Sequence, residues 1–158
     1  MFCLIQRLKS LREKFMKLRK NKPWKPAPEY SKDLSGLTVN LLVQEMEEAT
    51  NFVKNVLQAK VIYEDPDFAA IKGFGSQWCF HTYHTYDLHP FRVNTESSEK
   101  KGLGIELRLI GCNPDQVEKR AKEKGYKILS NSSNKAHGMR ECYILDNDGY
   151  CWVPSIII

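Results

Sequence analysis

The sequence is short of the features that usually identify a protein class. It contains five cysteines but no Cys-x-x-Cys pair, and an odd number cannot pair completely. The wide spacing of these cysteines favours buried thiols in a reducing compartment over a disulfide framework. Purely apolar runs span only a few residues, which is too short to cross a bilayer. The apolar start at 1–5 is also too short for a secretory signal, so we expect a cytoplasmic protein.

Patterns of two common enzyme classes are absent from the sequence as well. Gly73 and Gly75 lack the third glycine and the following helix of a phosphate-binding loop. No serine or cysteine has a base at a spacing that indicates a nucleophilic triad. The composition, with 42% hydrophobic and 27% charged residues, is ordinary for a folded domain and argues against disorder over most of the chain.

The net charge of +5 over 158 residues is unevenly distributed. Residues 1–25 contain nine lysines and arginines against the single acidic residue Glu13, a net charge of +8. The remaining residues contain fifteen basic and eighteen acidic side chains, a net charge of −3. The sequence thus predicts a mildly acidic body with a basic N-terminal arm.

Residues 1–20 have the pattern of a basic amphipathic helix. Leu4, Leu8, Leu11, Phe15 and Leu18 follow one another at helical spacing, with lysine and arginine on the other faces. Such a helix packs on the body, packs on a partner or a second copy, binds an anionic membrane surface, or serves as a mitochondrial presequence; these alternatives stay open. No aromatic side chains interleave with the basic face to stack on bases, so we expect no nucleic-acid binding.

Residues 21–36 form a proline-rich linker in this interpretation. Pro23, Pro26 and Pro28 interrupt a continuing helix and favour an extended backbone. Trp24 and Tyr30 are expected to pin the linker to the surface of the body. The body itself comprises residues 37–158.

In the body, one order of elements occurs twice. The first unit is expected to have a strand at 37–43, a helix at 45–57, and strands at 60–63, 68–72 and 77–83. The second unit is expected to have a strand at 105–110, a helix at 114–123, and strands at 126–129, 141–145 and 150–153. The sequence therefore predicts an α+β fold of two βαβββ units, which form a curved mixed or antiparallel sheet cup with helices on its outer face.

Three stretches of the body resemble those of a known superfamily. One is Val39-Asn40-Leu41-Leu42-Val43, followed by an acidic helix start and by Ala49, Phe52, Val56 and Leu57. The second is 120–126, Arg-Ala-Lys-Glu-Lys-Gly-Tyr, and the third is the tail 137–153, with Asp146-Asn147-Asp148-Gly149-Tyr150 at its turn. In this order they resemble the vicinal oxygen chelate superfamily, which includes glyoxalase I, bleomycin resistance proteins and extradiol dioxygenases. The resemblance covers 37–156, about three-quarters of the chain.

The resemblance implies a cup that holds a divalent metal in some members and a drug-like molecule without metal in others. The position of the first metal ligand matches Thr38, with Asn40 two residues on, and neither is a normal ligand for a divalent transition metal. The last position matches Val153, which has no donor atom. Only His81 and Glu106 remain as metal-binding candidates, where three or four protein ligands are needed. We therefore favour no metal cofactor and keep a divalent metal as the alternative.

The predicted cup is polar without being suited to a metal. Alternation along the strand at 105–110 places Glu106 and Arg108 on the face opposite the apolar residues. Pairing the last hairpin across a four-residue turn places Cys142 opposite Val153 and Ile144 opposite Cys151, with Arg140 on the same face. The residues predicted to line the pocket are Thr38, Asn40, His81, Tyr83, Glu106, Arg108 and Arg140, with Leu42, Cys142, Cys151 and Val153 as its apolar wall.

The resemblance thus implies a metal-free protein that binds a small molecule in the cup, as a homodimer. One alternative is a metal-dependent lyase, isomerase or dioxygenase with a displaced ligand set of His81, Glu106, and His84 or His89. Another is an interaction module in which the basic arm is the functional part. The sequence does not identify the ligand, the arrangement of the dimer or the role of the arm.

Overall fold

The computed structural model describes residues 17–86, 89–91 and 101–158, and within them it contains two four-stranded mixed sheets. The first unit comprises β1 (Val39–Val43), α3 (Met46–Phe52), the π-helix η1 (Val53–Leu57), β2 (Lys60–Glu64), β3 (Phe68–Gly73) and β4 (Ser76–Thr82). After the short 3-10 helix η2 (Tyr83–Tyr86), the second unit comprises β5 (Glu106–Ile110), α5 (Pro114–Glu123), β6 (Lys127–Asn134), β7 (Met139–Leu145) and β8 (Cys151–Ile157). The predicted twofold repetition of strand, helix and three strands is confirmed.

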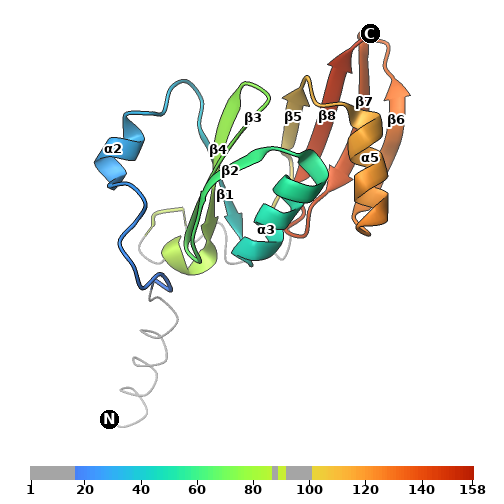
Figure 1. Cartoon of the computed structure of the whole chain (residues 1–158). Coiled ribbons are helices and arrows are strands. Elements are labelled where there is room, and N and C mark those ends of the chain that lie inside the picture. The colour runs from blue at the N-terminus through green and yellow to red at the C-terminus, as the bar shows by residue number, and fades with distance from the viewer. Residues whose placement is uncertain (1–16, 87–88, 92–100) are drawn as a thin grey trace.

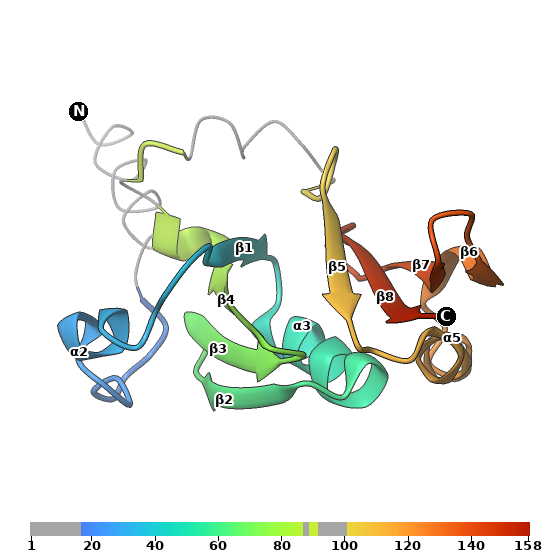
Figure 2. The same ribbon diagram turned by 90° about the horizontal axis from the view of Figure 1, so that it is seen from above.

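Both sheets have the same topology. Their strand orders are β1-β4-β3-β2 and β5-β8-β7-β6. The first strand of each unit runs parallel to the last, and the other neighbours are antiparallel. We predicted one curved sheet, but the strands form two separate sheets. α3 and α5 lie on the same side of the molecule (Figures 1 and 2).

α3 packs on the first sheet, and α5 packs on the second sheet and against η1. α5 begins and ends as predicted, because Asn113 caps it by accepting a hydrogen bond from the amide of Gln116, 3.2 Å away, and Gly125 follows with a positive φ of 77°. The first helix widens into η1, and the carbonyl of Val56 in that wide turn accepts a hydrogen bond from Nε of Arg120 at 2.8 Å. This bond links the helical segments of the two units.

A shared aromatic core joins the units into one body. Phe52 of α3 contacts Tyr126 and Trp152 of the second unit, with ring centroids 4.8 and 5.9 Å apart. Trp78 of β4 contacts Trp152 at 5.5 Å. Trp152 and Phe52 are each 1% exposed. Burial of such large rings is the main source of stability in a core of this kind.

The turn between β7 and β8 forms hydrogen bonds with the backbone of β1 along its free edge. The hydroxyl of Tyr150 accepts a hydrogen bond from the amide of Leu42 at 3.1 Å and donates one to its carbonyl at 3.0 Å. The carboxylate of Asp148 accepts a hydrogen bond from the amide of Gln44 at 2.8 Å. β1 pairs with β4 along its other edge, so the second unit satisfies backbone groups that an edge strand would leave open.

We expect this turn to make the stability depend on pH through Asp148. Burial, with smaller contributions from Asp146 and Glu48, raises the pKa of Asp148 from 3.8 to about 6. Because the folded state holds this proton more tightly than the unfolded state, the contribution is greatest below about pH 4 and falls as the pH rises to about 6. Asp148→Asn keeps an oxygen acceptor for Gln44 and removes the charge. The variant should therefore be more stable than the parent by about 1–2 kcal/mol at pH 7.

Urea unfolding at half-unit steps from pH 4 to 7 measures this effect. The difference between the two stability curves should grow between pH 4 and 6 and then level off. Parallel curves would contradict the prediction, because they would mean that the Asp148 carboxyl titrates alike in the folded and unfolded states.

The register of the last hairpin differs from the prediction by one residue. Leu145 pairs with Cys151, and Ile144 pairs with Trp152, so five residues rather than four separate the strands. The carboxylate of Asp146 holds the longer turn by accepting hydrogen bonds from the amides of Asp148 and Tyr150. Since a slip of one residue reverses every side chain, Cys142 and Ile144 belong to the core under α5 and not to the predicted pocket wall.

The proline-rich segment is more ordered than its composition predicts. The helix α2 (Ala27–Ser31) begins directly after Pro26 and carries Pro28 in its first turn, where proline is tolerated. It lies across the first sheet from α3 (Figure 2). The amphipathic helix predicted for 1–20 lies outside the described residues at positions 1–16, and 17–20 are not helical. In the described part of the chain, no helix is long and apolar enough to span a membrane.

Candidate ligand-binding site

The first sheet carries a cavity of about 510 Å³ on the face that points away from α3. Strand register accounts for this face, because Asn40, Cys79 and Ala70 lie in one row across β1, β4 and β3. Leu42, His81 and Phe68 form the next row. The intervening residues, such as Leu41 and Phe80, belong to the core on the other side. Alternation therefore places one polar and aromatic face toward the cavity.

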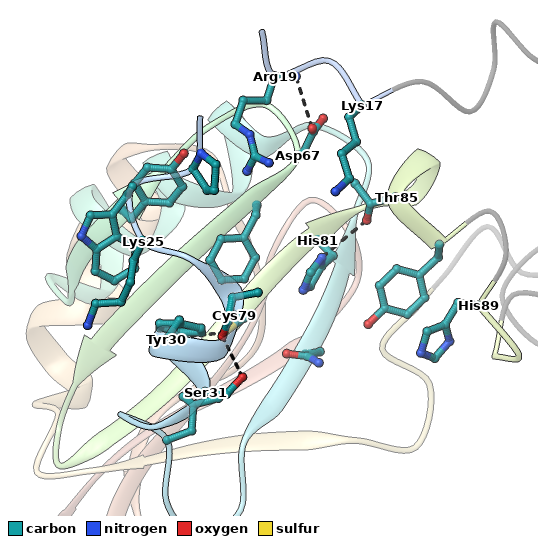
Figure 3. A pocket seen from close by; sticks show the side chains of 18 residues that line it. Lys17, Arg19, Lys25, Tyr30, Ser31, Asp67, Cys79, His81, Thr85 and His89 are labelled. Carbon is teal, nitrogen blue, oxygen red and sulfur yellow. Dashed lines mark hydrogen bonds between the residues drawn. The ribbon is translucent and has the colours of Figure 1, made fainter. Parts of the chain in front are cut away.

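The N-terminal segment 17–34 closes this cavity from the other side (Figure 3). Its start is held by the turn between β2 and β3. The backbone amides of Leu18 and Arg19 donate hydrogen bonds to the Asp67 carboxylate at 2.8 and 3.2 Å. The guanidinium of Arg19 pairs with Asp65 at 2.9 Å. Asp67 is 3% exposed and also contacts His84 at 2.8 Å, so a buried carboxylate fixes the entry of the segment.

Aromatic contacts fix the middle of the same segment. Trp24 stacks on Tyr63 with ring centroids 5.2 Å apart and an interplanar angle of 20°. Tyr30 meets Phe68 edge to face at 5.6 Å, and its hydroxyl lies 3.1 Å from Sγ of Cys79. Burial raises the pKa of Tyr30, so this hydroxyl stays protonated at neutral pH. The prediction that Trp24 and Tyr30 pin the linker to the body is confirmed.

His81 lies among the aromatic rings of the cavity. Its ring lies 5.0 Å from that of Phe68 and 5.4 Å from that of Tyr86, and Nδ1 is 3.5 Å from the Thr85 hydroxyl. Burial, with a smaller contribution from the charges of His89 and Lys17, lowers the pKa of His81 to about 4. The imidazole is therefore neutral at pH 7 and adds no charge to the cavity.

The other residues predicted for the first unit are placed differently. Asn40 lines the cavity, whereas Thr38 precedes β1 and is not part of the lining. Tyr83 was predicted to share the face of His81, but β4 ends at Thr82 and the chain turns into η2. The ammonium group of Lys101 lies 4.3 Å from the centroid of the Tyr83 ring, and burial raises the pKa of the Tyr83 hydroxyl to about 12.

On the second sheet, Glu106 and Arg108 share a face, as alternation predicts, but they do not reach the cavity. Arg108 pairs with Glu141 of β7, a carboxylate that is 0% exposed, and more distantly with Glu106 at 3.8 Å. Glu141 also accepts hydrogen bonds from Tyr143 at 3.1 Å and from Ser155 at 3.5 Å, and lies 3.1 Å from Nε2 of His137. Burial raises the pKa of Glu141, yet these hydrogen bonds and the charge of Arg108 together hold it below the ordinary value.

Arg140 lies on the opposite face of this sheet, which corrects its predicted place in the pocket. Its guanidinium forms two hydrogen bonds with the carboxylate of Asp115 in the first turn of α5, at 2.7 and 2.5 Å. The cause is the hairpin register described above, because Arg140 pairs with Ile156 and not with Ser155. The sequence prediction missed Glu141 for the same reason. The observed register places its side chain beside Tyr143, on the same face of the sheet as Arg108. Of the seven predicted site residues, the cavity brings together Asn40 and His81.

Some positions of this chain correspond to metal ligands in the superfamily that the sequence resembles. The side chains at these positions do not fit a divalent metal. A hydroxyl and an amide, from Thr38 and Asn40, stand where a histidine would be needed, and Val153 offers no donor. Glu106 lies on the other sheet beside Arg108. No group of three or more histidines, cysteines and carboxylates within the described ranges is arranged to hold a metal ion.

The fold is similar to those of several solved structures. No family model matches the sequence, and no curated protein matches it. A glyoxalase/bleomycin resistance protein/dioxygenase family enzyme from Burkholderia phytofirmans PsJN matches in structure with a TM-score of 0.65 at 16% identity, over 77% of this chain and 97% of that chain. A glyoxalase-related enzyme from Fulvimarina pelagi matches with a TM-score of 0.63 at 14% identity, over 77% and 87%. This chain has the glyoxalase/bleomycin-resistance fold.

A third match with the glyoxalase/bleomycin-resistance fold is a fosfomycin resistance protein, FosX, from Listeria monocytogenes. Its TM-score is 0.58 at 18% identity, and the match covers 79% of this chain and 95% of that chain. The fold that the sequence resemblance implied is therefore confirmed. Three strands of this fold, β1, β3 and β4, form the floor of the cavity. The proline-rich segment covers the cavity from the other side.

Proposed function

We propose that this protein binds a small amphipathic molecule in the cavity between the first sheet and residues 17–34, without a metal ion. The observation that carries the proposal is that the chain's own N-terminal segment covers the cavity. Its volume of about 510 Å³ lies within the range of small-ligand sites, which are mostly apolar with a few polar groups. Here the apolar part is aromatic, and Asn40 and the neutral His81 supply polar groups.

The chemistry of the available donors also supports a metal-free site. The displaced ligand set of the alternative hypothesis needs His81 together with Glu106 and His84 or His89. His84 contacts Asp67 and Thr82 and is not part of the cavity lining. His89 does line the cavity, but both His81 and His89 pack against the ring of Tyr86, at 5.4 and 4.3 Å. The homodimer implied by the resemblance stays a prediction.

A neutral bicyclic probe, 2-naphthylmethanol, tests the proposal by calorimetry on the full chain. We expect one molecule to bind per chain, with an unchanged Kd after dialysis against a chelator. Ser31→Trp places a large ring on α2 at the cavity lining and should weaken binding at least tenfold. Ser35→Trp, directly after the covering segment and not part of the lining, is the matched control and should bind like the parent.

Two results would overturn the proposal. One is that neither 2-naphthylmethanol nor a charged compound with the same ring binds, or that the Ser31→Trp and Ser35→Trp variants bind equally well. The other is a stoichiometric divalent ion, found by elemental analysis, that dialysed protein takes up again with micromolar affinity or better and that binding of the probe requires. The second result would support the metal-dependent alternative.

A further inference from the structure

One of the cations that line the cavity has no ion-pair partner in the described part of the chain. Four charged residues line the cavity: Lys17, Arg19, Lys25 and Asp67. Arg19 is paired with Asp65 and Lys25 with Asp33, while Asp67 is occupied by the amides of 18 and 19 and by His84. Lys17 has no ion-pair or hydrogen-bond partner among residues 17–86, 89–91 and 101–158. Lys17 is thus the cation of the lining that no described carboxylate pairs.

The position of Lys17 directs that charge into the site. Figure 3 shows its ammonium group directed toward Thr85 and His81, on the floor of the cavity. Because His81 is neutral at pH 7, it neither repels a cation nor adds to the attraction of an anion. Lys17 is therefore the side chain in this part of the cavity that can distinguish ligands by charge.

Seven rings surround the remaining space. They touch in a continuous series of contacts between 4.3 and 6.3 Å, from Trp24 through Tyr63 and Phe68 to His81, Tyr86 and His89, with Tyr30 beside Trp24 and Phe68. Rings in such an arrangement favour a flat aromatic guest through stacked and edge-to-face contacts. A set of rings can also hold an organic cation, but the unpaired ammonium group of Lys17 in the same lining opposes that choice.

We propose that the ligand is a planar aromatic anion, with its ring among the aromatic side chains and its anionic group at the ammonium group of Lys17. This inference rests on the proposed function, since it names the class of molecule that the cavity binds. Lys17, Trp24 and Tyr30 all precede the first βαβββ unit. The N-terminal segment is therefore part of the binding site and sets its charge preference, while the repeated fold supplies the floor.

Three probes that share a naphthalene ring and differ in charge test this inference. They are 2-naphthoate, 2-naphthylmethanol and 2-naphthylmethylammonium, measured by calorimetry at pH 7 and low salt. We expect the anion to bind about tenfold more tightly than the alcohol and the cation to bind more weakly than the alcohol, because a charge-assisted contact at a half-open site is worth about one decade in Kd. Added salt should reduce the preference.

Lys17→Met removes the charge and keeps the apolar stem. We expect this variant to lose the preference, so that the ratio of the two dissociation constants, alcohol to anion, falls from about ten to about one. Lys20→Met is the matched control, because Lys20 lies on the same segment but not at the cavity, and it should keep the preference. Thermal midpoints equal to that of the parent confirm that both variants are folded.

The outcomes separate this inference from the proposed function. If the alcohol binds and Ser31→Trp blocks it, but the anion gains no advantage or Lys17→Met keeps that advantage, the cavity binds ligands and the assignment of an anion is overturned. If none of the three probes binds, the proposed function itself fails.

Discussion

Replacing Tyr150 by phenylalanine should lower the free energy of unfolding by about 2 kcal/mol, although it removes a single oxygen atom. Tyr150 is 5% exposed, and its hydroxyl bonds to both the amide and the carbonyl of Leu42. Without it, two backbone groups at the edge of β1 lose their partner in a buried place, and each such loss costs about 1–3 kcal/mol before relaxation. Urea unfolding at pH 7 measures the effect, and the thermal midpoint should fall by roughly 4–8 °C.

Tyr126→Phe is the matched control for this substitution. The ring of Tyr126 packs against Phe52, and its hydroxyl has no hydrogen-bond partner in the part of the chain that the structure describes. We expect the control to stay within about 0.5 kcal/mol of the parent. Equal losses in the two variants would show that Tyr150 acts only through its ring. Hydrogen exchange at the amide of Leu42 should become faster in Tyr150→Phe and not in Tyr126→Phe.

Replacing Arg108 by methionine should cost about 1–3 kcal/mol at pH 7, because it leaves the carboxylate of Glu141 buried without its cation. The exposure of the Arg108 side chain, 36%, places the expected loss below that of a fully buried pair. Glu141 has a lowered pKa in the parent, so its contribution is present above its ordinary value of 4.5 and is lost as the pH falls through the lowered value. In Arg108→Met the pKa of Glu141 should rise toward or above 4.5, so acidification should destabilise this variant less than it destabilises the parent.

The other arginine of this sheet provides the control. Arg140 pairs with Asp115 at the exposed start of α5, and Arg140→Met should leave the midpoint of urea unfolding nearly unchanged. The double variant Arg108→Met with Glu141→Leu removes both charges and should recover most of the loss. A double variant as unstable as Arg108→Met alone would argue against an uncompensated charge as the cause.

The elements that the sequence predicts best are those with local signals at both ends. α5 has Asn113 as its cap, Pro114 at its first position and Gly125 after its end, and its predicted bounds are those observed. The last hairpin has no such local signals at its ends. Its turn contains Asp146, whose side chain binds two backbone amides and Nε1 of Trp152, and nothing in the spacing indicates that the turn needs a fifth residue.

Alternation along a single strand predicted correctly which face of the sheet a side chain occupies. His81 and Asn40 lie on the face that alternation assigns to them, whereas Tyr83 follows the end of its strand and turns elsewhere. The faces on which Arg140 and Glu141 lie were predicted from the register between two strands. An error of one residue in that register exchanges the two faces. The segment 17–34 contributes to the site through contacts almost 50 positions away in sequence, and its aromatic residues indicate that it docks but not where.

The bond between Tyr150 and Leu42 joins residues 108 positions apart, which has a consequence for the order of events during synthesis. A growing chain completes β4 at Thr82 well before residue 150 is made, and at about 5–20 residues per second the interval lasts several seconds. Throughout it, the first sheet exposes the backbone of β1 as an open edge that other chains can pair with. The nascent first unit is therefore the stage at which this protein is most exposed to aggregation, and emergence of the C-terminal hairpin ends that stage.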